Sequence, residues 1–147
     1  MTQERAAEDI QRVELALTRL FREVRSTLRD DVALVHPQAT PAAYNILAHL
    51  VNVGPARAAD LAEVFAVDKA AISRHLCQLE ALGLIERTPN PADRRALHVT
   101  ATEQGRRGYL TAKQVRLERL RERLRRWPPQ EVRQLADLLE KLDLGGR

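Results

Sequence analysis

The chain has 147 residues, of which 44% are apolar and only 3% aromatic, and it carries a formal charge of +4 with a pI near 9.8. This length suits one domain of ordinary size, or a small domain joined to a dimerising one, and a core drawn mostly from Leu, Ala and Val indicates a helical protein. The basic charge is consistent with a polyanionic partner but does not prove one, while a single cysteine excludes an intramolecular disulfide and suits a reducing cytoplasm.

Residues 2–34 are predicted to form one long amphipathic helix. Its apolar residues recur at steps of three and four, with charges between them: Ile10, Val13, Leu17, Leu20, Phe21, Val24 and Leu28. Because such a stripe cannot stay exposed on a stable helix, we expect it to pack on another helix of this chain or of a second chain. His36-Pro37 ends the helix, and the polar first ten residues contain no apolar signal region.

Residues 32–56 contain no Asp, Glu, Lys or Arg. Three prolines and several polar residues within the stretch argue against a membrane-spanning helix, so we interpret it as the most buried part of a soluble protein. Thr40-Pro41 supplies an N-cap followed by proline in the first turn, which predicts a second helix through about Val53. The core candidates on this helix are Tyr44, Ile46, Leu47, Leu50 and Val51.

His36 and Tyr44 are the polar-tipped residues of this uncharged stretch that we consider as candidates for lining a small-molecule pocket. The simpler interpretation, as satisfied core or helix-end residues, is favoured.

Residues 58–83 have the pattern of two short helices joined by a sharp corner. Ala58, Leu61, Ala62 and Phe65 form one apolar stripe, and Ile72, Leu76, Leu79 and Gly83 recur at intervals that give the second helix its own stripe. Asp68 can cap the second helix, and Gly83 supplies its left-handed end. This is the spacing of a helix-turn-helix.

The outward face of the second helix decides what the motif does. At 100° per residue from Ile72, Arg74 and Gln78 point outward, and Lys69 and Ser73 lie beside them. The small residues Ala70 and Ala81 on the same face would let this helix enter a DNA groove. Ser, Arg and Gln can hydrogen-bond base edges there. A solvated helix surface is the alternative, because Arg and Gln are common there; contact with DNA is favoured.

A hairpin with a basic tip follows. The runs at 84–88 and 96–100 contain β-branched residues, with Leu97 and Val99 on one side. Between them, PNPADRR is rich in turn residues and ends in Arg94 and Arg95, with Asp93 placed to hold one guanidinium. Such a tip suits phosphates or a narrow minor groove. A solubilising loop is the alternative, but a helix-turn-helix followed by a basic hairpin is more specific than either part.

The runs DKAAISRHLCQLEALGLIER, NPADRR and TEQG closely resemble the winged helix-turn-helix of MarR-type transcriptional regulators, and the resemblance extends over nearly the whole chain. It implies a mainly α (α+β) fold, with a recognition helix in the major groove, a wing in the minor groove and long terminal helices that form a dimer. By position, Ser73 and Arg74 match the usual base and phosphate contacts, and Asp93 with Arg95 matches the wing pair, to which Arg94 is an addition.

The remainder is predicted to be two helices. Thr100 and Glu103 fit a capping box, whereas the resemblance makes Thr102 the cap; either starts a helix from about 102 to 126. After Trp127-Pro128-Pro129 a last helix runs to about Leu142. Residues 68–100 hold five basic and four acidic residues, against ten and four over residues 101–133, so most of the positive excess lies on this helical region and is interpreted as a solvated face. The apolar stripes at both ends of the chain predict an intertwined homodimer.

Several other chemistries find no support. There is no phosphate-binding glycine loop and no nucleophile with a base, so we expect no enzyme and no cofactor. The four histidines lack ligand spacing, and no metal site is expected, although a metal sensor stays open. Cys77 departs from the polar or charged residue usual in the family; oxidation there would obstruct a DNA groove, but an inert small side chain is the favoured alternative.

These observations predict a cytoplasmic, dimeric, sequence-specific DNA-binding transcriptional regulator, most simply a ligand-responsive repressor on a pseudo-palindromic operator. Residues 55–100 would form the winged helix-turn-helix, and residues 1–54 and 101–147 the helical dimerisation region. The resemblance implies a small aromatic or phenolic effector. The alternatives are a helical protein-interaction module and a non-specific architectural DNA binder.

Overall fold

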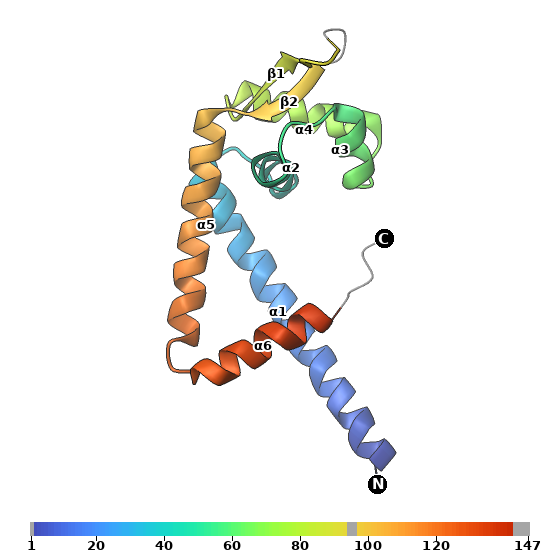
Figure 1. Cartoon of the computed structure of the whole chain (residues 1–147), viewed down its shortest axis with the longest axis vertical. Helices are drawn as coiled ribbons and strands as arrows, with labels where there is room; N and C mark the ends of the chain where they lie inside the picture. Colours follow the sequence, from blue (N-terminus) through green and yellow to red (C-terminus); the bar gives the residue numbers. More distant parts are fainter. Residues whose placement is uncertain (1, 94–96, 143–147) are drawn as a thin grey trace. The chain divides into compact units, whose positions relative to one another are not determined.

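The computed structural model describes residues 2–93 and 97–142. In chain order (Figure 1), the elements are α1 (Thr2–Val35), α2 (Pro41–Asn52), α3 (Ala58–Val64), α4 (Lys69–Ala81), β1 (Ile85–Pro89), β2 (Leu97–Ala101), α5 (Glu103–Leu124) and α6 (Pro129–Lys141). They fall into two compact units, Met1–Lys113 and Gln114–Arg147, and α5 runs through the division. The mainly helical fold with a small antiparallel sheet confirms the predicted fold class.

The core of the first unit is built around α2. Ala43, Tyr44, Ile46, Leu47 and Leu50 are all buried, and α2 contacts α1, α4 and β2. The α2 part of the uncharged stretch therefore lies at the centre of the core, as predicted, whereas Leu34 and Val53 of the same stretch are 44% and 72% exposed. Because burying an apolar side chain of this size stabilises a fold by about 1.5–3 kcal/mol, this helix holds the neighbouring elements together.

Three helices of this unit start in the same way, with a side-chain oxygen that accepts a hydrogen bond from the backbone N–H three residues later. Thr40 Oγ1 accepts from Ala43 N at 3.2 Å, and Asp68 Oδ1 accepts from Ala71 N at 2.6 Å, as predicted. For α5 the cap is Thr102, whose Oγ1 accepts from Gly105 N at 3.0 Å. Of the two caps that the sequence left open, the structure has the one that the resemblance implied.

The corner between α3 and α4 is made by Ala66 and Val67. Ala66 has a φ of +50°, a left-handed conformation that usually favours glycine, and its N–H donates to Glu63 O at 3.1 Å. Val67 N donates to Ala62 O at 3.0 Å. Two carbonyl groups at the end of α3 therefore accept hydrogen bonds from the corner residues. The next helix, α4, begins at Lys69.

At its other end α4 ends at Ala81, and Gly83, two residues later, has the predicted left-handed φ, +71°. Leu84 N then donates to Leu79 O at 2.9 Å, the closing bond of a Schellman end. Because that N–H completes the helix end, β1 begins at Ile85, one residue later than predicted. The second strand, β2, is described from Leu97 onward, and its predicted start at residue 96 lies outside the described residues.

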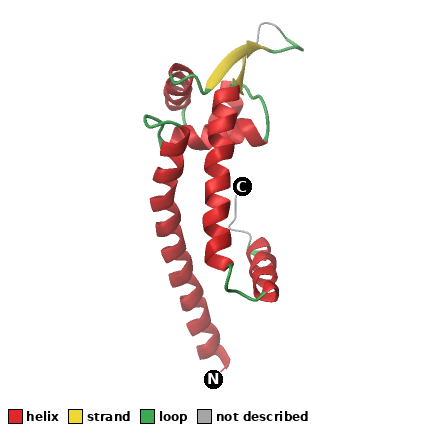
Figure 2. Cartoon of the chain, turned by 90° about the vertical axis from the view of Figure 1, so that its left-hand side faces the viewer, coloured by secondary structure: helices red, strands yellow, loops and turns green. Residues whose placement is uncertain are grey.

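The two strands pair antiparallel, from Ile85 opposite Ala101 to Pro89 opposite Leu97 (Figure 2). Leu97 and Val99 were predicted to share one side of the strand; Val99 is buried, but Leu97 is 52% exposed because it lies at the far end of the hairpin. On the other edge of β2, Val99 exchanges two backbone hydrogen bonds with Ala56, at 2.8 and 3.1 Å. The segment leading into α3 is therefore tied to the hairpin.

Two hydrogen bonds and one ring contact fix the start of α5 on this unit. Thr102 Oγ1 donates to Gly83 O at 2.6 Å, and Asn52 Nδ2 donates to the hydroxyl of Tyr109 at 2.7 Å. The Tyr109 ring also packs against that of Tyr44, with centroids 5.8 Å apart. The start of α5 is thus bonded to the end of α4 and to α2.

In the second unit, residues 125–128 join the end of α5 to α6. Most of its apolar side chains are exposed, including Leu120 at 51% and Leu138 at 62%. In the first unit, α1 has the same property, with Ile10 70% exposed. No helix within the described ranges is long and apolar enough to cross a bilayer.

Candidate nucleic-acid interface

One side of α4 is buried and the other is open. Ile72, Leu76 and Leu79 are 2% exposed or less, as their spacing predicts. Ser73 and Arg74, one and two positions further along, are exposed. The helix is therefore held through one stripe, and the polar residues between its members lie on the surface.

Lys69, Ser73 and Arg74 stand out on this surface. All three are exposed, and among the described residues no hydrogen bond or ion pair engages their side chains. An arginine fork with five donors and no internal acceptor suits an external partner that offers paired acceptors, such as a guanine edge or a phosphate. These three predicted site residues are therefore all at the surface of α4.

Lys69 and Ser73 also lie at the rim of a hollow of about 240 Å³ between α3, α4 and β1. Its lining includes Ala58, Ile72 and Arg87. Arg87 Nε donates to Glu80 Oε2 at 3.2 Å, joining β1 to α4. The sequence reasoning did not single out Arg87; its place two residues after the buried Ile85 was the available signal, because alternate strand residues share a face.

Gln78 differs from its prediction. Its side chain was expected to point outward into solvent, but it is only partly exposed. Both the nitrogen and the oxygen of its amide form hydrogen bonds within the protein. Its Nε2 donates to Gln38 O at 3.0 Å, and its Oε1 accepts from Thr40 Oγ1 at 3.3 Å. The reason is the turn between α1 and α2, which packs beside this end of α4 and offers one acceptor and one donor.

The wing is described only in part. Asp93 is exposed in the loop after β1, and Arg94 and Arg95 lie outside the described residues. The pairing of Asp93 with Arg95 therefore stays a prediction. Cys77 is exposed on α4 with a free thiol, and its sensitivity to oxidants also stays a prediction.

The two predicted ligand-pocket residues have other partners. His36 Nδ1 accepts a hydrogen bond from Gln38 N at 3.1 Å, within the turn after α1. Tyr44 is 4% exposed and packs on Tyr109. Both environments are those of the simpler interpretation, a helix-end residue and a core residue, and a role in ligand binding stays a prediction for each.

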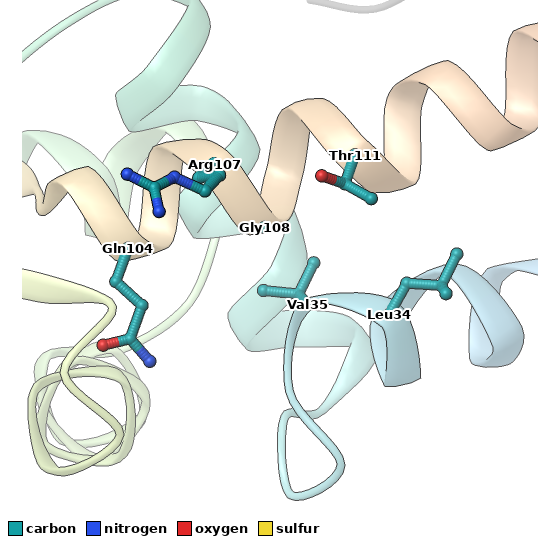
Figure 3. A pocket seen from close by; sticks show the side chains of 6 residues that line it. All are labelled: Leu34, Val35, Gln104, Arg107, Gly108 and Thr111. Atoms are coloured by element: carbon teal, nitrogen blue, oxygen red, sulfur yellow. The ribbon is translucent and has the colours of Figure 1, made fainter.

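A larger cavity lies nearby, in the first unit, between the end of α1 and one face of α5 (Figure 3). It has a volume of about 510 Å³ and is lined by Leu34, Val35, Gln104, Arg107, Gly108 and Thr111. The four α5 residues recur at steps of three, one and three, so they share one face of the helix. Sequence reasoning missed them because nothing in the spacing of α5 alone shows which of its faces meets α1.

Arg107 is the charged group of this cavity. Its Nη2 lies 3.5 Å from Glu103 Oε1, in an exposed pair one turn apart on α5. Such a pair contributes little to stability, so the guanidinium can exchange that carboxylate for another anion at low cost. No group of three or more His, Cys, Asp or Glu side chains within the described ranges is placed to hold a metal ion.

Comparison with known proteins gives a consistent result. A model described as MarR family matches residues 39–96. The uncharacterized HTH-type transcriptional regulator YxaD of Bacillus subtilis (strain 168) is 37% identical over 100 residues, which are 68% of this chain and 70% of YxaD. The HTH-type transcriptional repressor NicR of Pseudomonas putida is 38% identical over 69 residues, 47% of this chain and 44% of NicR. Among solved structures, RV1404 from Mycobacterium tuberculosis superimposes with a TM-score of 0.81 at 26% identity, covering 92% of this chain and 93% of its own.

Proposed function

Because the chain belongs to the MarR family, whose members among its relatives are helix-turn-helix transcriptional regulators, we propose that it is a sequence-specific DNA-binding repressor. The observation that carries this proposal is the surface of α4, where Lys69, Ser73 and Arg74 are exposed and unengaged among the described residues. Repression as the direction of control follows NicR, which is named a repressor.

Each residue of this surface has a distinct role in the proposal. Arg74 donates two hydrogen bonds to a guanine edge, and Ser73 bonds an adjacent base or phosphate. Lys69, at the start of α4, contacts a phosphate of the DNA backbone. In the wing, Arg94 and Arg95 reach phosphates or the minor groove, with Asp93 orienting Arg95. Gln78 would have to give up two internal hydrogen bonds to touch a base, so we assign it no base contact.

The protein acts as a homodimer in this proposal. The exposed apolar side chains of α1, of the end of α5 and of α6 give each chain a surface that a second copy can cover. Two copies of α4 would then meet major grooves one helical turn apart, which is the geometry of a pseudo-palindromic operator. Residues 1–54 and 101–147 supply the dimerisation region, residues 55–100 supply the DNA-binding region, and the protein works in the cytoplasm.

Control by a small aromatic acid or phenol fits the cavity between α1 and α5. Its volume of about 510 Å³ lies in the range of small-molecule sites, Leu34 and Val35 offer apolar contact, and Arg107 offers a partner for a carboxylate. In this proposal, a ligand binds more tightly to a conformation in which α1 and α5 are further apart than to the conformation that binds the operator. Such a ligand shifts the population away from the DNA-binding conformation. Benzoate is a suitable probe: it should weaken DNA binding, and Arg107→Ala should remove this response while Arg106→Ala, outside the cavity, retains it.

Fluorescence anisotropy tests the central proposal. The purified chain is titrated into labelled DNA from the region upstream of its own gene and, separately, into a scrambled duplex of equal length and composition. We expect at least a hundredfold preference for the upstream DNA. Equal affinity for both duplexes would indicate a non-specific architectural binder, and no binding to either would indicate a protein-interaction module.

A further inference from the structure

The partly buried amide of Gln78 joins α4 to a segment about forty residues earlier in the chain. Its Nε2 donates to Gln38 O at 3.0 Å, and its Oε1 accepts from Thr40 Oγ1 at 3.3 Å. Gln38 and Thr40 belong to the turn between α1 and α2. The exposed α4 surface and the end of the long helix α1 are thereby connected through one side chain.

The turn is held in shape by its own bonds, so it offers Gln78 a fixed pair of groups. His36 N donates to Val32 O at 3.1 Å, and Ala39 N donates to His36 O at 3.0 Å. His36 Nδ1 accepts from Gln38 N at 3.1 Å. Thr40 Oγ1 is placed by its capping bond from Ala43 N. Rigid partners lower the entropy lost when Gln78 binds them, which makes the contact more effective.

An amide matches this pair of groups. The Gln38 carbonyl needs a donor and the Thr40 hydroxyl needs an acceptor, and the planar carboxamide of Asn and Gln carries both. Asn would be one methylene shorter. A glutamate could accept from Thr40 but would place a carboxylate against the Gln38 carbonyl oxygen, where two acceptors repel.

We propose that Gln78 is a positioning residue for DNA recognition: it fixes α4 to the α1–α2 turn and so sets how Lys69, Ser73 and Arg74 are presented. This inference rests on the proposed DNA binding. Without the link, α4 samples several orientations relative to the turn, and only a fraction of them fits the grooves. The apparent dissociation constant rises by the inverse of that fraction, although each side chain that touches a base is still present.

The test uses Gln78→Met, which keeps the length of the side chain and removes both hydrogen bonds. We expect its affinity for the upstream DNA to fall roughly 3- to 30-fold, the range for one or two hydrogen bonds. The same factor should apply to duplexes altered at single base pairs, since no base is read by Gln78. Amide exchange over residues 36–43, measured by mass spectrometry without DNA, should become faster.

Two further variants serve as controls, and a third, Gln78→Glu, repeats the loss of the link. Gln38→Met removes an exposed side-chain amide from the same turn but keeps the backbone carbonyl that Gln78 uses, so its affinity should stay within about twofold of wild type. Thr40→Ser keeps the hydroxyl and should also bind normally. Gln78→Glu should behave like Gln78→Met or worse.

Each other outcome speaks against the inference. If Gln78→Met lowers the urea midpoint but the folded protein binds DNA as tightly as wild type, the two bonds are merely structural. If its loss of affinity is confined to one base pair, Gln78 reads that base directly. If wild-type protein shows no preference for the upstream DNA, the proposed function fails, and the positioning role fails with it.

Discussion

Arg74 and Ile72 lie two positions apart on α4, yet Arg74 is exposed and Ile72 is buried. A period of 3.6 residues predicted this difference correctly, and it also predicted Leu76 and Leu79 as core residues. The same reasoning missed the environment of Gln78, because periodicity counts neighbours along one helix. The turn that engages Gln78 comes from a segment that no local pattern relates to α4.

Arg74→Ala tests the proposed base contact. Removing a bidentate arginine should cost about 1–3 kcal/mol of binding free energy at one base position and relax the sequence preference there. The measurement is anisotropy on a set of duplexes with single base-pair changes, with urea unfolding as a check that the fold is intact. Unchanged operator binding would show that another face of α4 meets DNA.

Gly105 is a residue whose importance only the packing shows. A Cβ built there would come 2.9 Å from the carbonyl carbon of Leu84, still closer to its oxygen, and 3.1 Å from Leu47 Cδ1. A backbone carbonyl cannot move aside cheaply, so Gly105→Ala should lower the free energy of unfolding by about 1–3 kcal/mol in urea, despite the better helix propensity of Ala.

Gly108→Ala is the matched control for Gly105→Ala on the same helix. Its Cβ would lie 3.3 Å or more from Val35 atoms, a contact that a small side-chain shift can relieve. Since Ala favours a helix by about 0.8–1.0 kcal/mol over Gly, this variant should be neutral or slightly more stable. Equal destabilisation by both substitutions would contradict the packing argument.

At the scale of whole elements, most helix caps were predicted from the local sequence. Thr40, Asp68 and Gly83 perform the capping roles that their residue types indicated. The start of α5 was left open between two threonines, because both satisfy the local chemistry. The choice of Thr102 depends on Gly83 O, 2.6 Å from its hydroxyl, which becomes available only when the end of α4 is in place.

Thr102→Val tests this junction. Valine keeps the shape but loses the acceptor for Gly105 N and the donor to Gly83 O, so we expect the free energy of unfolding to fall by about 0.5–2 kcal/mol. Thr102→Ser should retain most of the stability. Urea unfolding followed by circular dichroism measures both, and an equally large decrease in the serine variant would mean that the methyl group matters more than the cap.

The wing gives a prediction about salt. Arg94→Ala and Arg95→Ala should each weaken binding to all duplexes by a similar factor and reduce the slope of log affinity against log salt by about 1. The comparison is Arg126→Ala, an exposed arginine after α5, which should leave that slope unchanged. Anisotropy between about 50 and 200 mM salt covers the useful range.

At the scale of the whole molecule, the amphipathic patterns of the terminal helices were predicted from spacing, and the structure leaves those stripes exposed on each unit. The cavity between α1 and α5 could not be predicted in this way. It depends on the close approach of Val35 to Gly108, where a Cβ would be 3.3 Å from Val35 Cγ1, and contacts between distant segments are not encoded in the period of either helix.

Leu138→Glu tests assembly. Leu138 is 62% exposed on α6, and a charge there should be costly if a second copy covers it. If the proposed dimer forms, sedimentation velocity should show a dimer for wild type and a monomer for this variant at the same concentration, and affinity for the full operator should fall on the order of 100-fold as one half-site is lost. Val53→Glu, at a 72% exposed residue next to α2, should change neither.

The double bridge between Ala56 and Val99 has a consequence for how this protein tolerates insertions and deletions. Val99 faces Arg87 across the hairpin and Ala56 on the opposite edge, so β2 serves two neighbours in one register. Adding or removing one residue within β2 would place His98 or Thr100 in the interior in place of Val99. The same change would break the two hydrogen bonds to Ala56 that hold the segment leading into α3. Changes of length are therefore expected to accumulate at the tip of the hairpin, and the five residues of β2 to keep their number.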